Sequence, residues 1–311
     1  MDKTGPPWQA NGMERVVFHL EPGLRRSAEA GQHNFIGKIV NVLSRAGMEV
    51  GFADASGLER ALSLGRPDRA MFHMAEPMRD GDLTFRRVYH YPFWQIERTS
   101  ARWDWDVARA AFDSVPDRTE ASRFYGYWQK RLFDDRARQA GRGNSLYIAL
   151  QGLIRQHRSF QSCAPLDMVE AVLKRAEGRP VIVGLHPNER YTDEDLWELE
   201  RLCDGRADIR IGGMKEALAD CAMVITQNSS AAFNGYLFGK PAVLFGKIDF
   251  HHIAANVSAL GIDGAFQTAA NVTPDYAGYV WWFWQQMSIN AGRPETEQKI
   301  ADRLRRFGWP V

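Results

Sequence analysis

Two short polar segments of the chain combine residue types that can bind a phosphate group. His186 and Pro187 directly follow the apolar run at residues 181–185, and Asn228, Ser229 and Ser230 follow the apolar run at residues 222–226. An imidazole can donate a hydrogen bond or a proton to a phosphate near neutral pH. Hydroxyl groups at the start of a helix add donors beside the positive end of its dipole. On residue types alone, the histidine could equally be a turn residue, and one serine could be only a helix cap.

Alternating strand and helix patterns surround both segments. The expected strands are residues 146–150, 180–185, 209–211, 222–226 and 241–245, and the expected helices are residues 165–177, 192–203, 214–218 and 230–238. Successive β-α-β units form a parallel sheet, and ligands bind at the carboxyl ends of its strands. We therefore expect His186 and Ser229 to lie near one another at one edge of a single sheet.

The first half of the chain shows a noisier alternation of the same kind. Strand patterns at 16–20, 48–52 and 70–74 accompany a helix pattern at 35–43, and a polar loop is expected at about 21–32. The fold class is therefore predicted to be α/β, with two Rossmann-like domains facing a cleft. The predicted divisions are residues 1–142, residues 143–274, and C-terminal helices at residues 275–311 that cross back to the first domain.

Composition limits the functional classes that the chain can belong to. It carries 39 Lys and Arg against 38 Asp and Glu, which gives no reason to expect a nucleic-acid binder. The three cysteines are scattered, which argues against a disulfide framework and against structural zinc. Residues 1–11 lack the apolar core of a signal peptide, and no segment approaches the length of a membrane span. A cytoplasmic location is predicted.

Three segments taken together resemble the bacterial capsular polysaccharide synthesis family, which includes the Kdo transferases that build capsule linkers. They are Leu-His-Pro at 185–187, Val-Ile-Thr-Gln-Asn-Ser-Ser at 224–230 and Phe-Gly-Lys-Pro-Ala-Val-Leu-Phe-Gly at 238–246. The His-Pro and Ser-Ser pairs are also similar to those of several bacterial sialyltransferases, which are GT-B enzymes that use CMP-sugars. The resemblance covers about residues 146–256, and it implies a GT-B architecture with the first domain on the acceptor side.

The resemblance implies a glycosyltransferase in surface polysaccharide synthesis. Its donor would be a CMP-linked nucleotide sugar, Kdo-like or sialic-acid-like, and its acceptor a glycan or glycolipid. The donor itself would be a co-substrate, so no cofactor and no metal are required. The implied ligands of the donor phosphate and nucleotide are His186, Pro187, Asn228, Ser229, Ser230 and Asn234, with His186 also the implied catalytic residue.

The chain departs from the family pattern at two places. Gln151 matches a family glutamine, but residues 152–159 contain no carboxylate, whereas the retaining Kdo transferases place an implied nucleophilic aspartate there. Asn234 stands where many GT-B enzymes carry a glutamate that binds ribose. Two alternatives therefore stay open. One is transfer of glycerol or ribitol phosphate from a CDP-alcohol on the same architecture, and the other is a non-catalytic GT-B relic that binds a glycan or a partner.

Further polar residues near these segments are candidates for substrate binding. Gln151, Arg155 and His157 lie in a cationic stretch that could bind an anionic sugar or simply form a solvated loop. Asp249 and His251 follow the strand at 241–245 and could form an acid–base pair more readily than a metal site.

The C-terminal region combines aromatic and basic residues. The aromatic run at 281–284 is followed by Lys299, Arg303, Arg305 and Arg306. Such a pattern could form a patch that docks on the inner face of the cytoplasmic membrane or on a capsule assembly complex. The alternative is a pair of terminal helices packed across the domain junction, as GT-B chains commonly have.

Overall fold

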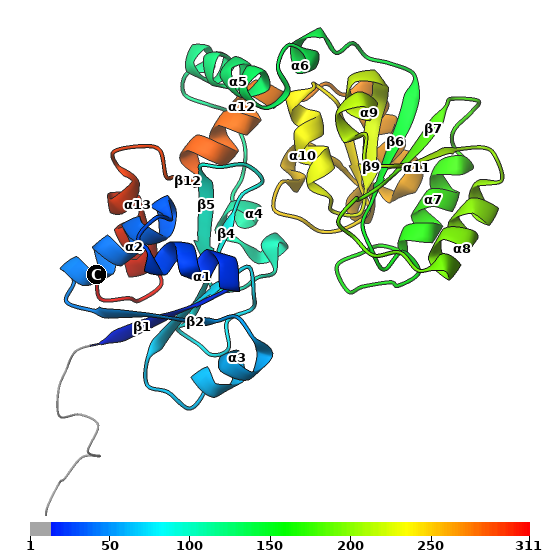
Figure 1. The fold of residues 1–311 in the computed structure, drawn as a ribbon. Helices are drawn as coiled ribbons and strands as arrows, with labels where there is room; N and C mark the ends of the chain where they lie inside the picture. Colours follow the sequence, from blue (N-terminus) through cyan, green and yellow to red (C-terminus); the bar gives the residue numbers. More distant parts are fainter. Residues whose placement is uncertain (1–13) are drawn as a thin grey trace, which may run out of the picture. The chain divides into compact units, whose positions relative to one another are not determined.

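The computed structural model describes residues 14–311, so the polar segment at residues 1–11 lies outside the described residues. The chain forms two α/β units, each built on a six-stranded sheet (Figure 1). The first unit is Met1–Asp106, as far as it is described, together with Trp284–Val311. The second unit is Val107–Phe283.

The first unit has a mixed sheet with the strand order β12-β5-β4-β3-β1-β2. Strands β1 to β4 pair in parallel, whereas β5 is antiparallel to β4 and β12 is antiparallel to β5. The bounds are β1 (Arg15–Leu20), β2 (Glu49–Asp54), β3 (Arg69–His73), β4 (Leu83–Arg87), β5 (Phe93–Glu97) and β12 (Ile289–Asn290).

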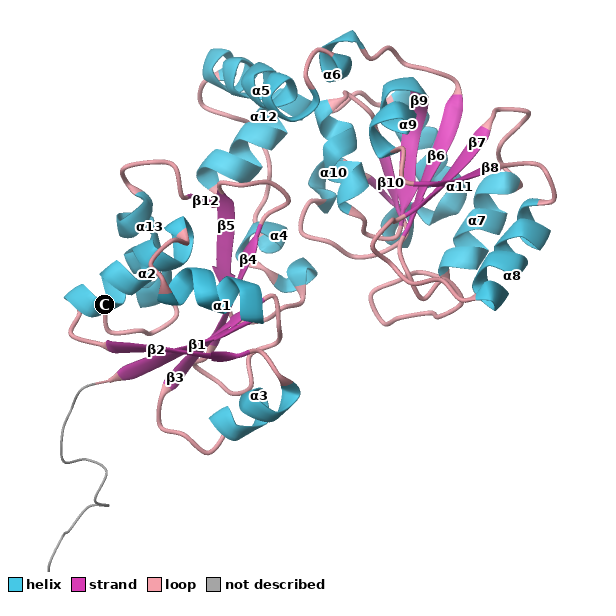
Figure 2. Ribbon diagram, viewed as in Figure 1, coloured by secondary structure: helices cyan, strands magenta, loops and turns pink. Residues whose placement is uncertain are grey.

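Helices cover both faces of this sheet. On one face lie α1 (Pro22–Glu29), α2 (Asn34–Arg45) and α13 (Thr296–Arg306), and α3 (Gly57–Ser63) lies on the other (Figure 2). Helix α2 confirms the predicted helix, because its apolar residues recur on one face and are buried there. The prediction of a loop at residues 21–32 is wrong, because helix α1 occupies most of this segment. Pro22 starts a helix whose Leu24 and Ala28 pack on the core.

The second unit has an entirely parallel sheet with the strand order β11-β10-β9-β6-β7-β8. The two strands that precede the polar segments, β7 and β9, flank the central strand β6, so the prediction of one parallel sheet is confirmed. The bounds are β6 (Ser145–Leu150), β7 (Val181–Leu185), β8 (Asp208–Ile211), β9 (Cys221–Thr226), β10 (Ala242–Leu244) and β11 (Ala255–Asn256).

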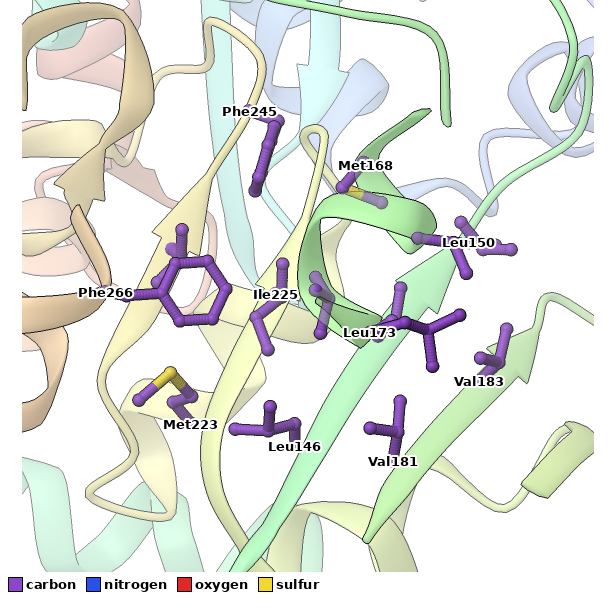
Figure 3. Close-up of a cluster of buried hydrophobic side chains, with 14 of the residues drawn as sticks. Leu146, Leu150, Met168, Leu173, Val181, Val183, Met223, Ile225, Phe245 and Phe266 are labelled. Carbon is purple, nitrogen blue, oxygen red and sulfur yellow. The ribbon is translucent and has the colours of Figure 1, made fainter. Parts of the chain in front are cut away.

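The two faces of this sheet differ in what covers them. Helices α7 (Pro165–Leu173), α8 (Asp193–Cys203) and α11 (Val257–Asn271) pack on one face, and Figure 3 shows the apolar core that Leu146, Val183 and Ile225 form beneath them. Helices α9 (Met214–Asp220) and α10 (Ser230–Leu237) cover the other face (Figure 2). Because side chains alternate along a strand, Tyr147 and Ala149 project towards α9 and α10.

The extents of the units differ from the predicted divisions. Helix α5 (Arg118–Phe133) belongs to the second unit, because Tyr125 Oη donates to the Tyr236 carbonyl at 2.6 Å and Gln129 Nε2 to the Leu237 carbonyl at 2.8 Å. At the other end, β12 and α13 belong to the first unit. The remaining helical segments are η2 (Arg102–Asp104), α4 (Asp106–Arg109), α6 (Arg136–Gln139), η3 (His251–Ile253), α12 (Tyr276–Trp281) and η4 (Trp282–Gln286).

The predicted fold class is confirmed as α/β with two mostly parallel, Rossmann-like sheets. Among the helices of residues 14–311, none is both long enough and apolar enough to cross a bilayer.

Candidate functional site

A pocket of about 340 Å³ opens in the second unit, where the carboxyl ends of β6 and β7 meet the starts of α9 and α10. The structure brings several of the residues that the sequence assigns to the donor together around it. His186, Pro187, Ser229, Ser230 and Asn234 all line this pocket.

Small residues leave the space that the pocket occupies. Ala149 and Gly184 lie side by side on β6 and β7 and form part of its wall. Gly212 and Gly213 lead from β8 into α9 with φ values of +76° and +69°, which residues with a Cβ rarely adopt. The chain can therefore turn sharply there without placing a side chain in the pocket.

The serine turn at the end of β9 is held by its own hydrogen bonds. Thr226 Oγ1 donates to the Ala149 carbonyl at 2.7 Å and accepts from the Ser229 N–H at 3.3 Å. The Ser229 hydroxyl accepts from the Ala231 N–H at 3.2 Å, which makes this buried serine the N-cap of α10. Ser230 is exposed, and neither its N–H nor its hydroxyl bonds to another residue of the described chain. Ser230 therefore presents the donors of this turn that a ligand can use.

The imidazole of His186 is oriented by the backbone that follows it. Nδ1 accepts a hydrogen bond from the Asn188 N–H at 3.2 Å, and the backbone N–H of His186 donates to the Tyr191 hydroxyl at 3.0 Å. The neutral ring then carries its proton on Nε2. Since Nε2 has no hydrogen-bond partner within residues 14–311 and the side chain is exposed, this N–H is available to a ligand.

The lining of the pocket combines apolar and polar groups and carries no formal charge. None of its lining residues in the described structure is an Asp, Glu, Lys or Arg. An anionic group can still bind at its rim, because His186, Ser230 and the start of α10 supply donors and the positive end of a helix dipole. Farther along α10, the buried Asn234 donates from Nδ2 to Met214 Sδ at 3.5 Å and places its amide in the wall.

The predicted residues after β6 do not line this pocket. Arg155 forms ion pairs with Glu194 at 2.9 Å and Asp195 at 2.8 Å, at the start of α8. His157 donates from Nε2 to the Gln161 carbonyl at 2.8 Å. Gln151 is half-buried at the end of β6, outside the pocket lining. The cationic stretch thus holds a loop against α8.

The predicted residues after β10 also lie elsewhere. Asp249 is fully buried, and His251 donates from Nε2 to the Ala108 carbonyl at 3.0 Å while its ring stacks on His252. Asn228 is buried in the serine turn without lining the pocket. No group of three His, Cys, Asp or Glu residues within the described range is placed to hold a metal ion.

The aromatic run before the C-terminus is largely buried. Trp284 is fully buried and stacks on Phe93 with ring centroids 4.6 Å apart, and Trp282 is 4% exposed. Among the basic residues that follow, Arg303 pairs with the carboxylates of Glu97 at 3.2 Å and Asp106 at 2.8 Å. The aromatic run and Arg303 thus contribute to packing, whereas Arg305 and Arg306 are exposed, and docking of this region on a membrane or an assembly complex stays a prediction.

Several pocket residues were not predicted from the sequence. Tyr147, Gly184, Met214 and the two glycines before α9 line the pocket beside the predicted residues. One signal could have pointed to them. Gly184 interrupts the apolar strand Val-Ile-Val-Gly-Leu, and a glycine inside a strand often marks a close approach of another group.

Comparison with solved structures identifies the architecture. The chain is similar to KpsC of Thermosulfurimonas dismutans, described as a beta Kdo 2,7 transferase, with a TM-score of 0.50 and 10% identity over 86% of this chain and 88% of that chain. The fold is GT-B. The wall teichoic acid polymerase TagF matches over 94% of this chain and 88% of that chain at 9% identity, but its TM-score of 0.29 is too low to support an argument. No protein-family model and no curated protein matches the sequence.

Proposed function

We propose that the chain is a glycosyltransferase of capsular or other surface polysaccharide synthesis, and that its pocket in the second unit binds a CMP-linked sugar. One observation carries the proposal. His186 and Ser230 follow strands on either side of β6, and both present hydrogen-bond donors to one uncharged pocket at the start of α10. A nucleotide sugar has an anionic phosphate to place at these donors and a neutral nucleoside to place inside.

The proposed chemistry follows from the charge that develops during transfer. When the bond between sugar and phosphate breaks, negative charge grows on the departing phosphate. The Nε2–H of His186, the N–H and hydroxyl of Ser230 and the dipole of α10 stabilise that charge. His186 acts here as a hydrogen-bond donor. To act as an acid, the ring would first have to be protonated on Nδ1 and lose the hydrogen bond from Asn188.

Calorimetric titration with CMP, CDP, UDP and GDP tests the proposal. We expect CMP to bind most tightly, and we expect CMP to be released when the protein is given a CMP-sugar of the Kdo or sialic acid type with a glycan acceptor. The Ser230→Ala variant should bind CMP more weakly and stay folded. If none of the nucleotides binds, or if Ser230→Ala binds CMP as tightly as the wild type, the proposed donor site is wrong.

A nucleotide-binding protein without transferase activity is the second candidate. It is favoured by the absence of a carboxylate both from the described lining of the pocket and from residues 152–159, because many transferases use one as base or nucleophile. Binding of CMP without consumption of any CMP-sugar would support this candidate. Preferred turnover of CDP-glycerol or CDP-ribitol would instead identify a phosphotransferase.

A further inference from the structure

The side chain of Tyr147 lies across Gly184 at the inner end of the pocket. Tyr147 projects from β6 towards α9 and α10, and it is 4% exposed. A Cβ atom at position 184 would lie 2.7 Å from both Cε2 and the hydroxyl oxygen of Tyr147, closer than real Cβ contacts allow. The ring can therefore occupy this place only because residue 184 is a glycine.

The hydroxyl of Tyr147 has no hydrogen-bond partner among residues 14–311. Although the residue as a whole is buried, its hydroxyl oxygen is not one of the fully enclosed polar atoms of the described structure, so the hydroxyl faces the space of the pocket. Burial, with a smaller contribution from Cys221, raises the pKa of the phenol, so it remains protonated and can donate. Both Tyr147 and Gly184 line the pocket, so a molecule inside the pocket can reach this hydroxyl.

The position along the strands indicates which part of a nucleotide would reach it. Gly184 lies on β7 two residues before His186, which directly follows the strand, and two residues correspond to about 7 Å along extended backbone. If the phosphate binds at His186 and Ser230, the group beside Tyr147 is the nucleoside. No charged side chain of the described structure lines the pocket, which matches the neutral base of a nucleotide.

We propose that Tyr147 is a specificity-determining residue whose hydroxyl hydrogen-bonds the nucleobase of the bound nucleotide, and that Gly184 is required to hold its ring there. This inference rests on the proposed function, because it needs a nucleotide in the pocket. It adds a residue to the donor site that neither the sequence motifs nor the fold comparison assigns.

The test compares Tyr147→Phe with a matched control, Tyr236→Phe. Tyr236 is a fully buried tyrosine of the same unit whose hydroxyl donates to the Phe250 carbonyl at 3.2 Å. In Tyr147→Phe, the Kd for CMP should rise about fivefold, the effect of one ordinary hydrogen bond. Its melting temperature without ligand should stay the same or rise. Tyr236→Phe should melt at a lower temperature and bind CMP as the wild type does.

Two further measurements complete the test. Gly184→Ala, which forces the ring to move, should weaken CMP binding more than Tyr147→Phe does. Ribose 5-phosphate, which lacks a base, should bind the wild type and Tyr147→Phe equally or bind neither.

Each contrary outcome has a distinct meaning. If the wild type binds CMP but Tyr147→Phe binds it equally well, the inference is overturned while the proposed function stands. The inference is also overturned if Tyr147→Phe loses thermal stability as Tyr236→Phe does, or if it weakens ribose 5-phosphate as much as CMP. If the wild type binds no nucleotide, the proposed function fails and this inference fails with it.

Discussion

The backbone N–H of Asn188 donates a hydrogen bond to Nδ1 of His186 at 3.2 Å. This single contact fixes the tautomer of the histidine, since Nδ1 can accept only when its proton is absent. The remaining proton lies on Nε2, at the rim of the pocket. The residue is thus arranged to donate a hydrogen bond to an anion in its neutral state, and protonation would break the contact that orients it.

Replacement of His186 should reveal this donor role. We expect His186→Ala to lower sugar transfer by ~10²–10³-fold, the usual cost of removing one donor to a developing negative charge. His186→Asn retains an N–H near the same place and should recover part of the lost rate. The measurement is CMP release from a CMP-sugar with acceptor present. Wild-type rates in both variants would refute the assignment, and an inactive Asn variant would indicate acid catalysis instead.

The two adjacent serines should separate into a structural and a binding residue. Ser229→Ala removes the N-cap of α10 and should cost about 1 kcal/mol of stability. Ser230→Ala removes a hydroxyl without a partner in the described protein, so the melting temperature should hardly change. Its CMP affinity should fall roughly tenfold or more, as expected for a hydrogen bond to a charged group. Urea unfolding and calorimetry on both variants check this, and the opposite pattern would contradict the geometry.

The sequence predicted the second unit well because each of its elements is specified locally. The strands β6, β7, β9 and β10 are short apolar runs, and the helices between them have apolar faces, caps or glycine stops. The pocket follows from that order, since parallel strands bring His186 and Ser230 to the same edge of a sheet. Which of the two serines caps α10 and which keeps its hydroxyl free depends on the side-chain orientation of Ser229 and Ser230. Residue types alone do not specify that orientation.

The first unit was predicted less completely because its elements depend on distant partners. Strand β5 contains two buried polar residues that break its apolar pattern. Gln95 donates to the Met287 carbonyl at 2.7 Å, and Glu97 pairs with Arg303. Both partners lie about 200 positions away in the chain. The burial of the aromatic run was not evident from the sequence for the same reason, because Trp284 stacks on Phe93, which is also far away in the chain.

The sequence allows Arg155 to bind a phosphate or an anionic sugar, whereas in the structure this side chain forms ion pairs at the start of α8. Arg155 lies outside the pocket and is held by Glu194 and Asp195. Arg155→Ala should therefore leave the Kd for CMP unchanged. It should lower the melting temperature only modestly, because the pair with Glu194 is exposed and the partly buried Asp195 keeps its hydrogen bonds with Thr192. A clear loss of CMP affinity in this variant, with the fold intact, would restore the interpretation of the cationic stretch after β6 as a phosphate-binding cluster.

The last prediction concerns Glu97, which is buried in the first unit beside Arg303. Burial raises the pKa of this carboxyl from 4.5 to about 7, although Arg303 opposes the shift. The proton is therefore held more tightly in the folded chain than in the unfolded chain.

The raised pKa makes the stability of the first unit depend on pH in a defined direction. Glu97 contributes most to the free energy of unfolding below pH 4.5, where it is protonated in both the folded and the unfolded chain. As the pH rises towards 7 and beyond, the free energy of unfolding falls by up to roughly 3 kcal/mol. Glu97→Gln cannot ionise, so it should lose less stability than the wild type between pH 4.5 and pH 8. Urea unfolding at several pH values measures the difference. Parallel pH profiles for the two proteins would show that burial does not hold this carboxyl in its neutral form.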